Sequence, residues 1–153
     1  MNRRKVITAI TGLVILVVAV TFVVDTEDPK SQNKDVISHD YTFTGESENW
    51  SAVFEVEGKE VFYEEEEVLK LDSNANSAFE LMYKGSLEEL SSVSRMRYEY
   101  VTPNSVMERT TNSPPNETFF TDRGNDLVRQ EAVIKVTVEW DGSTETFTME
   151  AEE

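Results

Sequence analysis

The sequence predicts an all-β protein: an antiparallel β-sandwich of about seven or eight strands, immunoglobulin-like in broad architecture, behind one N-terminal transmembrane helix. Short runs in which apolar and polar residues alternate predict the strands, and turn residues between these runs separate one strand from the next. An uncharged stretch at residues 6–24 predicts the helix. The chain has 153 residues, which is enough for one domain of ordinary size with an appendage.

The uncharged stretch, VITAITGLVILVVAVTFVV, is long enough to cross a membrane. As a helix it would span about 28 Å, close to the roughly 30 Å of a hydrocarbon core. Basic residues precede it and acidic residues follow it, so residues 1–5 are predicted to be a cytoplasmic flank and the remainder extracytoplasmic. A cleaved secretory signal is the alternative, but its apolar stretch is normally shorter, about 7–15 residues. The predicted location is therefore the cell membrane, with a single pass and a cytoplasmic N-terminus.

Residues 25–37 are predicted to be a flexible tether, because DTEDPKSQNKDVI is polar and lacks a sustained apolar period. Residues 38–153 are then the extracytoplasmic domain. The chain carries 14 Lys and Arg against 30 Asp and Glu, a formal net charge of −16. This balance argues against a nucleic-acid partner, because phosphate contacts need a basic surface. It is typical of a soluble exposed domain; attraction of cations or of a basic partner is the alternative.

The clearest strand pattern runs from Val133 to Met149. Asp141-Gly142 interrupts the alternation, and this pair tolerates the positive φ angles of a two-residue type I′ turn. The resulting register places Val136 opposite Phe147 on the apolar face. Glu145 alone faces an apolar neighbour, and we interpret it as a rim residue or a hydrogen-bonded one.

Other alternating runs predict strands at 41–45, 50–57, 61–71, 79–83, 96–100 and 118–121, with an end at Gly58 and a turn at 72–76. The run 64–67 consists of four Glu, which predicts an edge strand or a bulged segment whose charges discourage pairing with another chain. A calcium or basic-ligand site is the alternative, but a continuous Glu run lacks the irregular loop that calcium needs. No metal site is therefore predicted.

Two shorter segments complete the sequence. Ser86-Leu87-Glu88-Glu89-Leu90 predicts one helical turn with a capping box. Arg95 and Arg97, on the polar face of their strand, are expected to pair with surrounding acids. Residues 102–116 are the least regular stretch and contain three Pro, so this segment is the first candidate for a binding loop.

Catalytic motifs are missing from the sequence. It has no Gly-rich phosphate loop, no GxSxG elbow and no Cys, and His39 is its one histidine. Ser38-His39-Asp40 does not make a triad, because neighbours along a chain rarely have triad geometry, and His39 is interpreted as exposed. Paired carboxylates are available by number alone, which gives a carboxylate-based hydrolase little support. We therefore predict no catalytic, cofactor-binding or metal-binding residues.

Three segments carry a resemblance: YTFTGESENW at 41–50, Tyr83-Lys84-Gly85, and the stretch from Glu139-Trp140-Asp141-Gly142 to Glu145-Thr146-Phe147. They resemble a group of small exported or membrane-anchored proteins, often lipoproteins, of Bacillus-type Gram-positive bacteria. The chain lacks the acylated Cys of the lipoprotein members, which leaves the helix as its anchor. The resemblance implies an exported β-rich domain and transfers no activity or site residues.

The sequence thus predicts a non-enzymatic, membrane-anchored, extracytoplasmic binding module for a protein or cell-wall partner, acting through strand edges or residues 102–116. An accessory or inhibitory subunit of another membrane protein is the first alternative, and a carboxylate-based hydrolase is the second. A hydrolase requires a concave site with two acids, one with a raised pKa. A binding module requires an exposed apolar patch outside the core.

Overall fold

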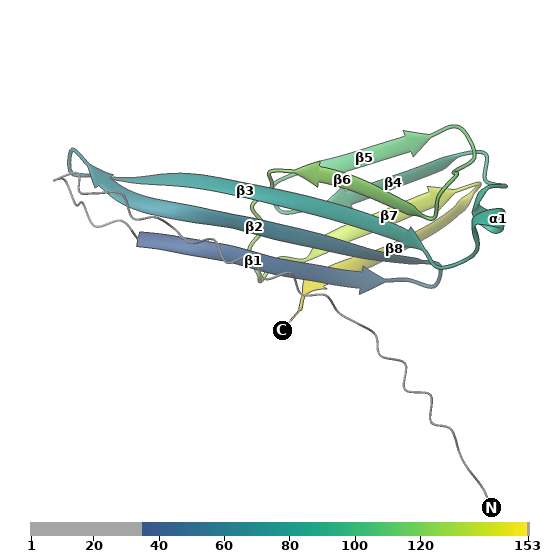
Figure 1. Cartoon of the computed structure of the whole chain (residues 1–153), viewed down its shortest axis with the longest axis horizontal. Coiled ribbons are helices and arrows are strands. Elements are labelled where there is room, and N and C mark those ends of the chain that lie inside the picture. Colours follow the sequence, from purple (N-terminus) through teal and green to yellow (C-terminus); the bar gives the residue numbers. More distant parts are fainter. Residues whose placement is uncertain (1–34, 153) are drawn as a thin grey trace, which may run out of the picture. The chain divides into compact units, whose positions relative to one another are not determined.

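The computed structural model describes residues 35–152, which form an all-β unit (Figure 1). Along the chain its elements are β1 (Asp35–Glu46), β2 (Trp50–Glu65), β3 (Val68–Tyr83), α1 (Leu87–Leu90), β4 (Met96–Val101), β5 (Val106–Thr111), β6 (Phe119–Gly124), β7 (Ile134–Trp140) and β8 (Ser143–Ala151). The predicted flank 1–5 and helix 6–24 lie outside the described residues, as does the tether up to residue 34. Within 35–152, no helix has the length and apolarity to cross a membrane.

The strands form one antiparallel eight-stranded sheet in the order β5-β4-β7-β8-β1-β2-β3-β6. The predicted all-β antiparallel class is confirmed, but a sandwich has two separate sheets, whereas here one sheet curls so that its halves face each other. The halves are joined where β1 pairs with β8, at Phe43–Ala151 and Thr44–Glu150. Gly45 permits this contact, because a Cβ at residue 45 would lie 2.1 Å from the carbonyl oxygen of Thr148.

The core lies inside the curl and is built from every second residue of the strands. The alternating runs predicted at 50–56, 79–83, 96–100 and 134–138 all send their apolar side chains inward, which confirms those faces. Phe79 stacks on Tyr100 with ring centroids 4.1 Å apart. The largest fully buried side chains are Trp50, Phe43, Phe54, Phe79, Leu81, Leu90, Met96, Ile134 and Met149.

The two edge strands of the sheet, β5 and β6, are linked by side chains. Asp122 of β6 is buried and accepts a 2.9 Å hydrogen bond from Nε of Arg109 in β5. It also accepts a 2.8 Å hydrogen bond from the hydroxyl of Tyr98 in β4. Burial, and next the Asp122 carboxylate, raise the pKa of Tyr98. An ion pair and a buried hydrogen bond therefore close the curl where no backbone pairing joins β5 to β6.

The β7–β8 hairpin has the predicted register, with Val136 opposite Phe147. Asp141 and Gly142 have φ angles of 41° and 87°, as a type I′ turn requires. Glu145 is a hydrogen-bonded residue, as interpreted from the sequence: it accepts from the Ser47 hydroxyl at 2.5 Å and from the Asn49 side-chain amide at 2.6 Å. Burial acts to raise the pKa of Glu145, but these hydrogen bonds outweigh it and lower that pKa.

Several predicted boundaries were wrong. Strand β2 continues through Gly58, and β3 includes residues 72–76, which were predicted to be a turn. The predicted strand 61–71 is instead the end of the β2–β3 hairpin, whose turn residues Glu66 and Glu67 have φ angles of 54° and 63°. The four consecutive Glu therefore spread into solvent around a turn, which keeps like charges apart.

Smaller differences concern the ends of other segments. Strand β1 begins at Asp35, so the last three residues of the predicted tether belong to the sheet. Segment 102–116 is more regular than predicted, since it contains the edge strand β5. The capping box at Ser86 is confirmed, with hydrogen bonds in both directions between Ser86 and Glu89.

Candidate functional site

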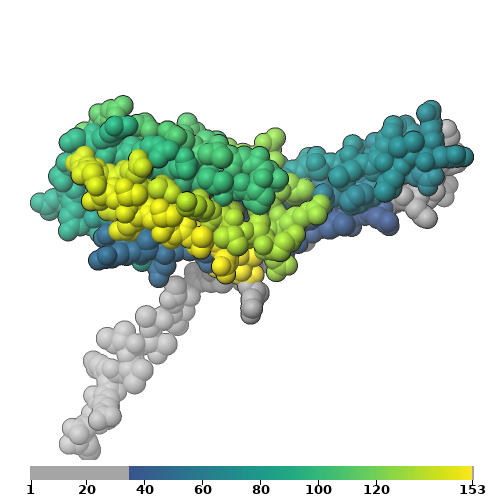
Figure 2. Space-filling view, turned by 180° about the vertical axis from the view of Figure 1, so that it is seen from behind, coloured from purple at the N-terminus to yellow at the C-terminus, as the bar shows by residue number. Residues whose placement is uncertain are grey.

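The outer ends of β1, β2 and β3 extend past the core as a three-stranded arm (Figures 1 and 2). We define the arm as residues 35–40 of β1 and residues 57–76 of the β2–β3 hairpin. The hairpin is paired without interruption as far as Glu65–Val68, and β1 joins it from Asp35–Phe62 inward. Figure 2 shows the arm as the narrow teal part that continues from the wider body.

The arm carries apolar side chains that its own core does not cover. Five large ones are exposed by about half or more: Val36 56%, Ile37 47%, Val68 56%, Leu69 72% and Leu71 50%. Among the described residues they make up half of the ten exposed large apolar side chains. The arm is thus the largest grouping of such side chains in the described part of the chain.

These apolar side chains lie on both faces of the arm. Leu69 and Leu71 pair with Glu64 and Phe62, so they share the face that continues the core. Ile37 pairs with Glu60 and lies on that face too. Val36 and Val68 alternate with these residues and lie on the opposite face. The core of this chain could bury the apolar side chains on one face of the arm at most. The arm therefore exposes more apolar side chains than the fold of the described residues buries.

The arm is also strongly acidic. Against two basic residues, Lys59 and Lys70, it carries nine acidic ones: Asp35, Asp40, Glu57, Glu60, Glu64, Glu65, Glu66, Glu67 and Asp72. Lys70 is paired with Glu65 at the tip. The arm therefore presents a negative potential together with its apolar side chains, which suits a partner that is both apolar and basic.

A buried charged cluster fixes the base of the arm. Glu60 is 5% exposed and accepts a 3.0 Å hydrogen bond from Nε2 of His39 in β1. It also accepts 2.9 Å and 3.1 Å hydrogen bonds from Nη2 of Arg129, in the connection between β6 and β7. The hydrogen bond from Arg129 lowers the pKa of Glu60, burial opposes it, and the His39 hydrogen bond adds to it. The cluster ties three segments together where the core ends and the arm begins.

The interpretation of His39 as an exposed residue was wrong, because its side chain is 5% exposed. The signal was present in the sequence: His39 stands two residues before Tyr41 and four before Phe43, in the same alternating series. Placing the end of the tether at residue 37 hid that series. Glu60 lies 21 residues from His39 and 69 residues from Arg129 in the sequence. Sequence spacing therefore does not indicate that these three side chains meet.

The β6–β7 connection is itself held in place beside the arm. Asn104 donates a 2.8 Å hydrogen bond from its side chain to the carbonyl of Leu127. Thr102 is buried and donates to Asp126 at 2.5 Å. Residues 102–105 of the predicted binding loop therefore support the base of the arm. The pairing predicted for Arg97 is confirmed, because Arg97 contacts Glu99, Glu108 and Glu139.

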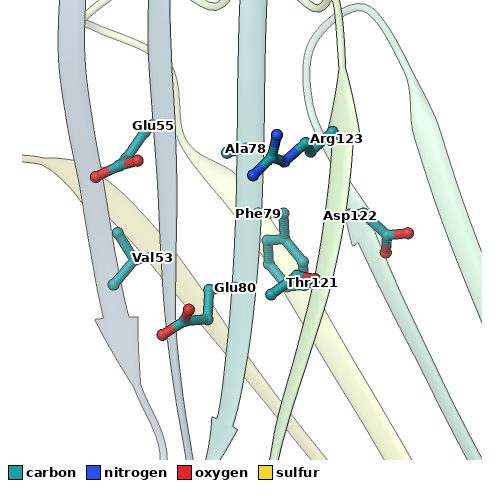
Figure 3. A pocket seen from close by; sticks show the side chains of 8 residues that line it. All are labelled: Val53, Glu55, Ala78, Phe79, Glu80, Thr121, Asp122 and Arg123. Carbon is teal, nitrogen blue, oxygen red and sulfur yellow. The ribbon is translucent and has the colours of Figure 1, made fainter.

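A shallow hollow of about 390 Å³ lies on the outer face of β2, β3 and β6. Figure 3 shows Arg123 of β6 reaching toward the small Ala78 of β3, with Glu80 also on β3, Glu55 on β2 and Asp122 pointing away from them. The carboxylates of Glu55 and Glu80 line the same face of the hollow. Three described carboxyl groups have a shifted pKa, those of Glu60, Glu108 and Glu145, and all three shifts are downward. In residues 35–152 no three acidic or histidine side chains are arranged to hold a metal ion.

Comparisons of the chain with models of protein families, with curated proteins and with solved structures find no match.

Proposed function

We propose that the chain is a non-enzymatic, membrane-anchored, extracytoplasmic binding module whose arm holds a protein partner. The observation that supports this most is the exposure of five large apolar side chains on both faces of the arm. Exposed apolar strands invite aggregation, and proteins usually cover them or blunt them with charge. Here four Glu lie at the tip, where Val68 and Leu69 pair with Glu65 and Glu64. The other three apolar side chains, Val36, Ile37 and Leu71, are exposed farther from the tip.

The carboxyl groups support a binding role over hydrolysis. A general acid needs a pKa raised toward neutral pH. Burial raises a carboxyl pKa, but at Glu60 and Glu145 hydrogen bonds outweigh it and both pKa values fall. Glu60, which is buried, and Glu145, which is partly buried, therefore hold their charge as structural acceptors.

The order of the chain favours a partner close to the membrane. Ten residues, 25–34, separate the proposed helix 6–24 from Asp35. Ten extended residues reach at most about 36 Å, and Asp35 pairs with Phe62 near the tip of the arm. The arm would thus work within that distance of the bilayer. Its acidic tip would be repelled by anionic headgroups, so the partner we propose is a protein at the membrane surface.

This placement also supports the second candidate function, an accessory or inhibitory subunit of another membrane protein. In both candidates the arm makes the contact. They differ in whether helix 6–24 contributes to binding or serves as an anchor alone.

The test compares two matched variants in intact cells that produce the full chain. In the arm variant, Val36, Leu69 and Leu71 are replaced by Ser; in the body variant, the similarly exposed Val106, Phe119 and Val133 are replaced by Ser. After chemical cross-linking, the arm variant should lose about 90% or more of the cross-linked partner, and the body variant should retain it. Equal cross-linking by both variants would contradict the proposal.

A third version lacking residues 1–24 separates the two candidates. If the helix only anchors, re-attaching the domain to the membrane by an unrelated helix restores the cross-linked partner. If the chain is a subunit whose helix packs against its neighbour, the unrelated helix fails to restore it.

A further inference from the structure

We propose that the partner adds an extended, cationic segment as a further strand along the free edge of β1 in the arm, at residues 35–40. The inference rests on the proposed function, because it assigns a partner chemistry and a binding mode to the same arm. It is carried by the direction of the backbone groups of β1 and by the charges beside them.

The edge of β1 is paired along only part of its length by the described strands. Strand β8 pairs with Phe43 and Thr44, and the N–H of Glu152 donates to the carbonyl of Thr42 at 2.8 Å. Beyond Thr42, toward Asp35, no described strand lies on that side of β1. An incoming strand at residues 35–40 would thus continue the line of β8.

The hydrogen bond at Thr42 fixes which backbone groups point out of the sheet. In an antiparallel ladder the N–H and C=O groups of successive residues point to alternate sides. Because Thr42 points toward β8, the backbone groups of Asp40, Ser38 and Val36 point toward the same open side. Ile37 and His39 point toward β2. Three residues of β1 therefore present donors and acceptors that no described strand pairs, and an added strand could use them.

The side chains beside this edge define what the added strand must carry. Val36 and Ile37 are about half exposed on opposite faces, and apolar side chains next to them would bury both. Asp40 lies opposite Glu57 on the neighbouring strand, so two carboxylates face a side chain placed next to Asp40. A Lys or Arg there would interact with both. Residues 35–40 contain Asp35 and Asp40 and no Lys or Arg.

Two other arrangements fit the charges less well. The open edge of β3 at residues 68–76 contains Lys70 as well as Asp72, so it does not select a cationic strand. Edge-to-edge pairing of two copies of this chain would bring two acidic β1 edges together, in molecules with a formal net charge of −16. Charge complementarity therefore favours a basic partner on β1.

The probe is the acetylated peptide Lys-Thr-Thr-Val-Val-Lys, which in the antiparallel direction sets its Lys residues beside Asp40 and Asp35. The control peptide has Glu in place of both Lys. Each is titrated into the full chain, labelled with ¹⁵N, in micelles of an uncharged detergent, and exchange of the backbone amide protons is followed by NMR.

The Lys peptide should slow exchange at Val36, Ser38 and Asp40 by about tenfold or more. It should leave Ile37 and His39 unchanged, because their N–H groups already face β2. The Glu peptide should bind about tenfold more weakly, since it meets like charges.

Two proline variants test the backbone contact directly. Ser38→Pro removes an N–H that faces the open side of β1 and leaves the pairing with β2 intact, a position where proline is tolerated. It should weaken binding of the Lys peptide about tenfold. Ser73→Pro is the matched control on the other open edge, because Tyr83 donates toward the β6 side at 2.7 Å and the same alternation turns Ser73 that way. It should change the affinity by less than about twofold.

Several outcomes would overturn the inference. One is binding of the Lys peptide without slowed exchange at the three residues, and another is equal weakening by Ser38→Pro and Ser73→Pro. Slow exchange at Val36, Ser38 and Asp40 before any peptide is added would show that the edge is already occupied. Sedimentation would then identify the occupant as a second copy or as this chain's own residues 25–34. If these outcomes occur while the arm variant still loses its partner in cells, strand addition is wrong and the proposed function stands.

Discussion

Replacing Arg129 with Ala tests whether the charged cluster holds the base of the arm. Arg129 is the more exposed member, with a side chain 57% exposed, and the Glu60 side chain is 6% exposed. Losing Arg129 leaves a buried carboxylate whose remaining side-chain partner within residues 35–152 is His39. Losing the Glu60 charge instead leaves Arg129 free to turn into water. The cost should therefore be unequal, although the same ion pair is broken.

The magnitude follows from the kind of contact that is lost. Breaking a fully buried ion pair by removing one partner costs about 3–5 kcal/mol, and solvent screening at the exposed Arg129 reduces this. We expect Arg129→Ala to lower the free energy of unfolding by about 2 kcal/mol and Glu60→Gln by about 1 kcal/mol. The assay is urea denaturation of a fragment, residues 31–153, which contains all eight strands.

The pH dependence gives an independent check. The pKa of Glu60 is below its ordinary value of 4.5 in the folded chain, so its contribution is present above pH 4.5 and is lost as the pH falls toward the folded pKa. A protonated Glu60 no longer needs Arg129. The difference in free energy of unfolding between the native fragment and the Arg129→Ala variant should therefore be largest near pH 7 and shrink below pH 4.5. An equal cost for both variants, or a difference that does not change with pH, would refute the reasoning.

Three further changes test other contacts. Glu145→Ala removes the acceptor for both N–H groups of Asn49 and should cost about 2–3 kcal/mol in thermal unfolding; an unchanged melting temperature would contradict this. Gly142→Ala should cost about 1 kcal/mol in urea denaturation, from its positive φ alone, because a Cβ there meets nothing within 4 Å. Gly45→Ala should cost about 3 kcal/mol or prevent folding, because the added Cβ meets the backbone of Thr148; a stable variant with native circular dichroism would show that the two halves of the sheet are not held as described.

The hairpin between β7 and β8 could be predicted because its signals are local. The pair Asp141-Gly142 predicts a type I′ turn, and the alternation on each side of it predicts the register. The β2–β3 hairpin was missed because it lacks such local signals. Its turn residues, Glu66 and Glu67, are not among those that favour positive φ, and the polar stretch 72–76 has the composition of a turn although pairing with β2 makes it strand.

The candidate site could not be predicted, because it depends on where the core ends. Residues 57–63, EGKEVFY, lack the alternation of residues 50–56, yet pairing with β1 and β3 continues the same strand through them. The contact of Arg109 with Asp122 and that of Arg129 with Glu60 join segments far apart in the sequence. Such pairs follow from the curl of the sheet, which no single strand encodes.

Photo-cross-linking from single positions tests the central claim most directly, because it maps where the partner touches the chain. A benzophenone side chain is placed, one position at a time, at the arm residues Val36 and Leu69 and at the body residues Val106 and Val133, all of which are exposed. The full chain is then irradiated in intact cells. The arm positions should give one common adduct and the body positions none; adducts from the body positions alone would contradict a partner held by the arm.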